Sequence, residues 1–119
     1  MSMASNTPTL RPRSRMSSVV VVHDEPVRAA KLHEALRNQN VVHVARDVEE
    51  MIEELGTATR LACIVCVATR ETDPIEVRDH AVMNGTPAEH IVFIGPDDLS
   101  RPEMIERTAR VVESFGRDA

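Results

Sequence analysis

The sequence predicts an α/β protein in which one four-stranded parallel sheet lies between two layers of helices. Two observations predict this three-layer sandwich. Four short apolar runs, typical of buried strands, alternate with four segments whose apolar residues recur at helical spacing. The connections between them are short, and strands that alternate with helices in this way form parallel sheets with right-handed crossovers. The chain is therefore predicted to contain four consecutive strand–helix units.

Length and composition favour a single globular domain. The chain has 119 residues, of which 42% are hydrophobic and 28% are charged. These values are typical of a folded domain and exclude a largely disordered protein. Two Phe are the whole aromatic content, without Trp or Tyr. The sequence therefore lacks the aromatic platforms on which single-stranded nucleic acids stack.

The predicted organisation is a flexible basic tail over residues 1–17, a folded domain over 18–116 and a short C-terminal end over 117–119. The tail holds three Arg and no acid, so the rest of the chain has 11 basic and 19 acidic residues, a net charge of −8. Since an acidic body repels nucleic acids and anionic membranes, neither is expected as a partner. No apolar run has the length of a signal-peptide core or a membrane span, which predicts a cytoplasmic protein.

The first strand is predicted over residues 18–23, because it holds four consecutive β-branched valines. It ends in Asp24 and Glu25, and Pro26 then presets φ for a helix predicted over 26–38. The two carboxylates lie where the positive end of the helix dipole favours acids. Ligands of open parallel sheets bind at the carboxyl ends of strands, so any ion or small-molecule chemistry is predicted at this acidic corner.

A second, shorter strand is predicted over residues 41–45, and its polar His43 suits an outer position in the sheet. Asp47 and Glu50 resemble a capping box at the start of the next helix, which Gly56 is predicted to end. The apolar stripe of that helix comprises Val48, Met51, Ile52 and Leu55.

The third strand is predicted over residues 61–68 and contains Cys63 and Cys66. Side chains three residues apart on a strand point to opposite faces, so these two thiols cannot share a metal ion or form a disulfide. They are predicted to be two buried, unlinked cysteines.

Two helices and a strand complete the predicted fold. Asp73 caps a helix that ends at residues 84–85, and the fourth strand covers 90–94. The last helix is predicted to begin at Ser100 as its cap and to end at Gly116. The predicted apolar face of the third helix comprises Ile75, Val77, Ala81 and Val82.

Residues 18–36 resemble the opening of the receiver domains of two-component response regulators, in which a hydrophobic strand runs into Asp-Asp-Glu-Pro and an amphipathic helix. The corresponding stretch is Val-Val-Val-Val-His-Asp-Glu-Pro. Residues 63–68 resemble the third strand of that family, and the order of elements matches over about residues 18–115. The resemblance implies a flavodoxin-like sheet with strand order 2-1-3-4 and a role in signal transduction.

The chain departs from the receiver pattern at the residues that carry the chemistry. His23 occupies the position of the first magnesium-binding acid, whereas Asp24 keeps the second. Ala68 stands where the family has its phosphorylated Asp, and Gly95 where it has Ser or Thr. The family's Lys is missing, as is one strand–helix unit. Two alignments stay open, because residues 90–96 match either the fourth or the fifth strand of a receiver.

Phosphoryl transfer in that family needs a carboxylate nucleophile, a bound divalent cation and a further cation that steadies the transferred group. One carboxylate of that set is kept, so the resemblance implies a protein that is not an enzyme and needs no cofactor. Asp24 and Glu25 are the candidate ligands for Mg²⁺, against the alternative that they only cap the following helix. Asp73 is an alternative phosphoacceptor, although its place before Pro74 predicts a helix cap.

The leading functional hypothesis is a non-phosphorylatable adaptor or regulator in bacterial signalling or localisation. Loss of one unit leaves the flank of the fourth strand open, and exposed apolar surface of this kind marks protein interfaces. We expect a protein partner, or a homodimer, at the open sheet edge or the last helix. The residues of this predicted interaction surface are Val92, Ile94, Ile105, Ala109 and Val112.

Two other hypotheses stay open. The first is a switch that binds Mg²⁺ or a small anionic ligand at Asp24 and Glu25. The second is a DNA-associated regulator that uses the three Arg of the tail. Magnesium titration discriminates the first from an adaptor, and the salt dependence of DNA binding discriminates the second.

Overall fold

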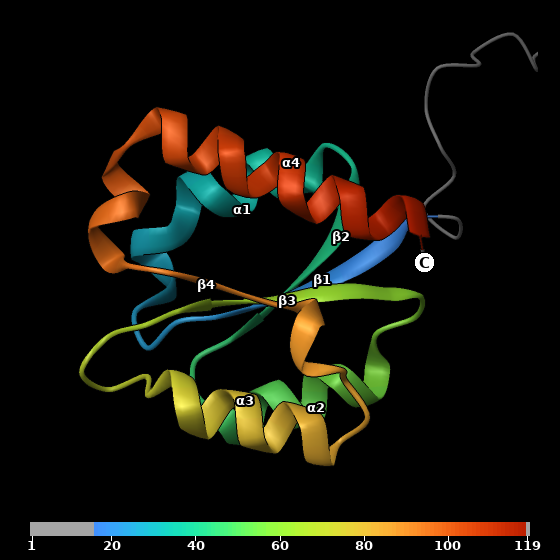
Figure 1. Ribbon diagram of the computed structural model, residues 1–119. Helices are drawn as coiled ribbons and strands as arrows, with labels where there is room; N and C mark the ends of the chain where they lie inside the picture. The colour runs from blue at the N-terminus through green and yellow to red at the C-terminus, as the bar shows by residue number, and fades with distance from the viewer. Residues whose placement is uncertain (1–15, 119) are drawn as a thin grey trace, which may run out of the picture.

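The structure, a computed structural model, describes residues 16–118, and the side chains of 16–117. It consists of four parallel strands between two helical layers (Figure 1). The strands are β1 (Ser17–Val22), β2 (Asn40–Ala45), β3 (Leu61–Val67) and β4 (Ile91–Ile94). Their order is β2-β1-β3-β4, which confirms the predicted three-layer sandwich and its 2-1-3-4 sheet.

The helices divide evenly between the two faces of the sheet (Figure 1). They are α1 (Ala30–Arg37), α2 (Val48–Thr57), α3 (Pro74–Met83) and α4 (Pro102–Asp118). We call the side covered by α1 and α4 the α1/α4 face, and the other the α2/α3 face. Within residues 16–118, no helix is long and apolar enough to cross a membrane.

Strand β1 lies at the centre of the molecule and is buried on both faces, as its four valines predict. Val19 and Val21 belong to the core under α1 and α4, whereas Val20 and Val22 belong to the core over α2 and α3. All four are 0% exposed. The predicted tail over residues 1–17 needs a correction at its last residue, because Ser17 is buried and pairs with Asn40 of β2. Residues 1–15 lie outside the described residues.

The two cysteines of β3 face opposite sides of the sheet, as predicted. Cys63 is part of the core of the α1/α4 face and Cys66 part of the core of the α2/α3 face. Both are free thiols. Burial raises the pKa of each thiol to about 12, with a smaller contribution from Asp73 at Cys66. Because the thiolate is the reactive form, both cysteines are inert in the folded chain.

The predicted helix caps at Asp47 and Asp73 are confirmed. The Asp47 carboxylate accepts a hydrogen bond from the Glu50 backbone N–H at 2.9 Å, and Asp73 accepts one from Ile75 N–H at 2.9 Å. Helix α3 is followed by Gly85, whose φ of +95° lies in the left-handed region that favours glycine.

The first two helices differ from prediction at their ends. Residues Pro26–Ala29 form a separate 3-10 turn before α1 begins at Ala30. Gly56 lies inside α2, which continues to Thr57. Neither difference in helix boundaries changes which residues follow the carboxyl ends of the strands.

The last unit also departs from prediction. His90 belongs to a 3-10 turn, so β4 begins one residue later. The Ser100 hydroxyl donates to the Asp97 carbonyl at 2.9 Å within a second turn, and α4 begins only at Pro102. Gly116 does not end α4. It lies where the helix passes the start of β1, and a Cβ there would be 3.4 Å from the Ser17 hydroxyl oxygen.

The predicted apolar face of α3 is half wrong. Val77 and Ala81 are buried against the sheet, but Ile75 is 60% and Val82 47% exposed. At 3.6 residues per turn, the last two lie on the side of the helix opposite Val77 and Ala81. Helix α3 therefore packs on the sheet through a narrow row of small side chains.

Candidate functional site at the carboxyl edge of the sheet

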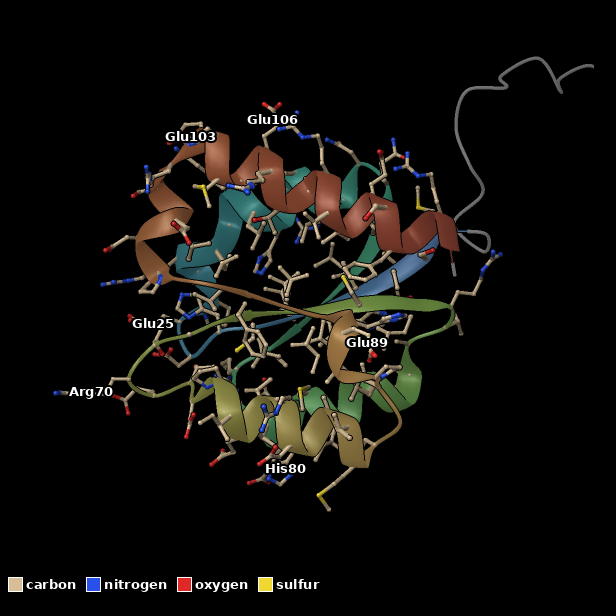
Figure 2. All side chains as sticks on the ribbon, viewed as in Figure 1. Glu25, Arg70, His80, Glu89, Glu103 and Glu106 are labelled. Atoms are coloured by element: carbon tan, nitrogen blue, oxygen red, sulfur yellow. The ribbon has the colours of Figure 1, made fainter. Side chains whose placement is uncertain are left out.

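The predicted acidic corner lies at the carboxyl edge of the sheet, where the ends of β1 and β3 are neighbours. His23 and Asp24 follow β1, while Ala68 and Thr69 follow β3. Glu25 and Arg70, labelled in Figure 2, mark this end of the molecule. Parallel pairing brings the two polar loops together although 45 residues separate Asp24 from Thr69.

The carboxylate of Asp24 is engaged by hydroxyl groups from the loop after β3. Its Oδ1 accepts hydrogen bonds from the Thr69 hydroxyl at 2.5 Å and the Thr72 hydroxyl at 3.0 Å. The Asp24 backbone N–H donates to the Thr72 hydroxyl at 3.2 Å, and the Thr72 N–H donates to the Thr69 hydroxyl at 3.0 Å. Asp24 therefore fastens the β3–α3 loop to the end of β1.

These contacts also keep Asp24 ionised. The Thr69 hydrogen bond is the main cause that lowers the pKa of Asp24, with further help from Thr72 and His23, while burial acts in the opposite direction. Hydrogen bonds donated to a carboxylate stabilise its charged form. The negative charge of the Asp24 carboxylate is thus stabilised mainly by the hydroxyl groups of Thr69 and Thr72.

His23 fills the position beside this carboxylate and is 2% exposed. Its Nδ1 lies 3.3 Å from Asp24 Oδ1 and 3.3 Å from the Glu25 backbone nitrogen, which donates to it. A protonated Nδ1 serves the first contact and an unprotonated Nδ1 the second, so the ring satisfies one of them at a time. Its Nε2 is buried and has no hydrogen-bond partner among the described residues.

The two candidate metal ligands are not brought together. Glu25 has a side chain 56% exposed, and its Oε2 lies 3.4 Å from Arg28 Nε. Asp24 is 21% exposed and is bound to the two threonines. No group of three or more His, Cys, Asp or Glu side chains in residues 16–118 could hold a metal ion. The carboxylates of Asp24 and Glu25 are thus engaged by different partners, two hydroxyl groups and one guanidinium group.

A crevice of about 410 Å³ lies beside the corner. Its lining residues are His23, Glu25, Arg28, Thr69, Pro96, Asp97, Leu99 and Ser100. Sequence reasoning named the acids of this edge but missed Thr69 and Thr72, which determine what Asp24 does. The available signal was the pair of threonines three residues apart between the third strand and the Asp-Pro cap.

Ala68 lies at the end of β3, and its backbone N–H donates to the Ile94 carbonyl at 2.8 Å. Its side chain is a methyl group, so this position offers no nucleophile. Asp73, the alternative phosphoacceptor, is committed to the cap of α3 through its hydrogen bond to Ile75 N–H. The position directly after β3 therefore carries a methyl group, and the carboxylate of Asp73 is engaged in the helix cap.

The predicted interaction surface needs a correction at Val112, which is 0% exposed and belongs to the core of the α1/α4 face. A residue without exposed area cannot contact a partner. The other four members of the predicted set, Val92, Ile94, Ile105 and Ala109, are partly buried against the same core. On β4 the largest exposed side chain is Phe93, at 43%, which points to the α2/α3 face.

Comparison with models of known protein families found no match, and comparison with curated proteins found none either.

Proposed function

We propose that this protein is a receiver-like adaptor that accepts no phosphoryl group and acts by binding another protein. One observation carries the proposal. The residue directly after β3 is Ala68, which carries only a methyl group, while the acid kept at the neighbouring strand end, Asp24, accepts hydrogen bonds from the hydroxyls of Thr69 and Thr72. These hydrogen bonds fix the β3–α3 loop to the end of β1. Phosphoryl transfer would instead need a carboxylate nucleophile at the position of Ala68 and a bound divalent cation.

The placement of the last strand and helix supports the receiver-like interpretation. Strand β4 pairs with β3 in the position of a fourth strand. Helix α4 packs beside α1 and contacts β3. Under this proposal the chain lacks one strand–helix unit of a complete receiver, and β4 is left as an edge strand.

We place the docking surface at that edge, with a second copy of this chain as the occupant. Strand β4 pairs with β3 on one side only. An edge strand presents unpaired N–H and C=O groups that another strand can bind. Phe93 adds an exposed aromatic ring beside those groups. Aromatic side chains are enriched at protein interfaces, so pairing of two β4 strands with both rings buried is the favoured contact.

The chemical half of the proposal is tested by NMR titration of the ¹⁵N-labelled chain with Mg²⁺, followed by beryllofluoride. We expect no saturable shift at the amides of Asp24, Thr69 and Thr72, since their side chains already bind one another. Titration with KCl at equal ionic strength is the control. A saturable shift confined to Asp24 and Glu25 would replace the adaptor with the Mg²⁺-binding or ligand-binding switch.

The docking half is tested by size-exclusion chromatography with light scattering. We expect a dimer for the wild-type chain and a monomer for Phe93→Asp, because the substitution places a charge at the centre of the contact. Val27→Asp is the control, since Val27 is 87% exposed and belongs to the 3-10 turn before α1, not to β4. A wild-type chain that is monomeric at every concentration would contradict the β4 contact.

A further inference from the structure

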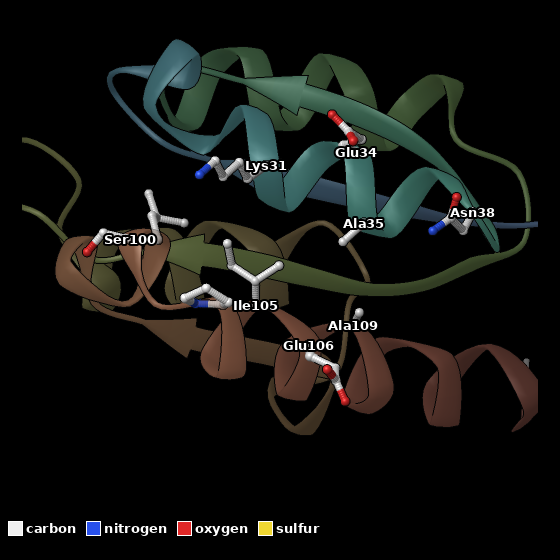
Figure 3. Close-up of a pocket in the computed structure, with 10 residues that line it drawn as sticks. Lys31, Glu34, Ala35, Asn38, Ser100, Ile105, Glu106 and Ala109 are labelled. Atoms are coloured by element: carbon white, nitrogen blue, oxygen red, sulfur yellow. The ribbon is translucent and has the colours of Figure 1, made fainter.

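Helices α1 and α4 lie side by side across a groove on the outer surface of the α1/α4 face (Figure 3). Its main hollow has a volume of about 530 Å³. The lining residues are Lys31, Glu34, Ala35, Asn38, Leu99, Ser100, Pro102, Ile105, Glu106 and Ala109. Ala35 and Ala109 lie across the groove from each other (Figure 3), and their short side chains leave space between the larger residues of the two helices. The hollow is within the size range of peptide and small-molecule sites.

The groove continues along α4 to the beginning of the described chain. A second hollow of about 220 Å³ shares Ala35 and Ala109 with the first. A third, of about 250 Å³, shares Asn40 and Glu113 with the second and is lined by Ser17. Residues 1–15 precede this point, so the groove opens where that segment joins the domain.

We propose that this groove binds residues 8–12 of the same chain, Pro-Thr-Leu-Arg-Pro, with Leu10 on the apolar floor between Ile105 and Ala109. Leu10 is the one large apolar residue between Ala4 and Met16. The contact is an interaction within the chain, and it holds or fails independently of the proposed adaptor function.

The length of the segment matches the length of the groove. Leu10 precedes Ser17 by seven residues, which reach about 23 Å when extended. Ser17 lies against Gly116, with its hydroxyl donating to the Gly116 carbonyl at 3.4 Å. From Gly116 to Ile105, eleven residues of helix span about 17 Å. Leu10 therefore reaches the apolar floor with little slack.

Conformation and charge favour the same occupant. Each proline fixes its own φ and disfavours helix at the residue before it, so Pro8 and Pro12 oppose a helical segment at Thr7 and Arg11. Residues 1–15 hold three Arg and no acid, against a net charge of −8 in the rest of the chain.

One acid on the groove wall is available to pair with an arginine of this segment. Glu106 pairs with Arg110 at 3.1 Å and Glu113 with Arg117 at 3.5 Å. Glu34 forms no ion pair within residues 16–118. We propose that Arg11 forms an ion pair with Glu34.

The test uses paramagnetic broadening in the full-length ¹⁵N-labelled chain carrying a nitroxide at Thr9→Cys. The native cysteines do not interfere, because both thiols are buried and their pKa is raised to about 12. We expect the amides of Ala35, Ile105 and Ala109 to lose most of their intensity. The amides of α3, on the opposite face, keep theirs.

Two variants show which side chains hold the segment. Leu10→Asp in the labelled chain is expected to restore the lost intensity, and Glu34→Arg to restore part of it. Glu53→Arg, an equally exposed charge reversal on α2, is the control and leaves the broadening unchanged. All three positions lie on the surface or in residues 1–15, so none is needed for the core.

Three results would overturn the proposal. One is a groove whose amides are not broadened, and another is equal broadening on both faces of the sheet. The third comes from mixing the nitroxide-labelled, unenriched chain with the ¹⁵N chain that has no nitroxide. Broadening of the groove in that mixture would identify the segment of a second copy, and not the chain's own residues, as the occupant.

Discussion

The two faces of the sheet receive the same kind of side chain from the strands but different cover from the helices. Alternate residues of β1 and β3 supply valine and cysteine to both cores, and Ile64 to the core of the α2/α3 face. On the α1/α4 face, α4 runs for 17 residues and Val92 and Ile94 of β4 lie under it. On the α2/α3 face, α3 buries only Val77 and Ala81, and Phe93 of β4 is left 43% exposed.

This difference separates two kinds of surface on one small domain. On the α1/α4 face, Val92 and Ile94 of β4 are partly buried against the core. On the α2/α3 face, the Phe93 ring of β4 is exposed. The two faces of β4 therefore differ in exposure because the helices cover them to different extents.

The largest expected effects come from the inner rows of the two helical layers. Leu32→Ala in α1 and Met51→Ala in α2 should each lower the free energy of unfolding by about 2–5 kcal/mol, since both side chains are 0% exposed. Ile75→Ala on the outer side of α3 should change it by less than about 0.5 kcal/mol. Urea unfolding followed by far-UV circular dichroism measures all three, because the chain has no Trp or Tyr. A cost at Ile75 comparable to that at Met51 would break the comparison.

The second effect is a pH dependence that belongs to the α1/α4 face. Burial is the main cause that lowers the pKa of His33, with smaller contributions from Arg37 and His23. In the unfolded chain the imidazole of His33 binds a proton at about pH 6.5, whereas in the folded chain it does so only at lower pH. The contribution of His33 to the free energy of unfolding is therefore fully present above about pH 6.5, and it is lost as the pH falls below that value. The loss has an upper limit of about 1.4 kcal/mol per pH unit.

His33→Leu tests this assignment, because leucine fills an apolar site without a titratable group. The variant should lose part of the wild-type decline in unfolding free energy between pH 7.5 and about 5.5. It also removes a buried Nε2 that has no hydrogen-bond partner among the described residues. Unchanged pH dependence in the variant would show that other groups cause the decline.

The third effect compares opening of the two faces directly, with one native thiol on each. In Cys63→Ala the remaining Cys66 reports on the α2/α3 face, and in Cys66→Ala the remaining Cys63 reports on the α1/α4 face. We expect Cys66 to react several-fold faster with an aromatic disulfide reagent under native conditions, since it is the register partner of the exposed Phe93. Equal rates would mean that both faces open only with global unfolding.

The smallest effect comes from glycines within helices of the two layers. A Cβ at Gly56 of α2 would meet nothing within 4 Å, so Gly56→Ala should raise the unfolding free energy by about 0.5–1 kcal/mol. Gly116→Ala in α4 should gain less, because its Cβ would lie 3.4 Å from the Ser17 hydroxyl oxygen. Thermal unfolding of the two variants side by side measures the difference, and a larger gain at Gly116 would be the contrary result.

The fold was predictable because its signals are local. Four consecutive valines can serve only a strand buried on both faces, and the Asp caps at 47 and 73 fix two helix starts through hydrogen bonds within three residues. The end of the last helix was not predictable from Gly116. Gly116 lies within α4 beside Ser17, a residue 99 positions away, and the helix continues past it.

The position of the candidate site was predictable from the sequence, but its hydrogen bonds were not. The acids after the first strand and the missing acid at Ala68 are visible in the sequence. The engagement of Asp24 by Thr69 and Thr72 depends on pairing between β1 and β3, which brings together loops with no sequence signal in common. The exposure of Phe93 likewise depends on how far α3 extends over the sheet.

The central position of β1 has a consequence for how the protein emerges from the ribosome. Its partners on one side come from β2, which follows soon after, but on the other side Val19 pairs with Cys63. Until β3 has been synthesised, one edge of this buried strand has no neighbour. Newly made chains that end before residue 61 should therefore depend on chaperones more than chains in which β3 already pairs with β1.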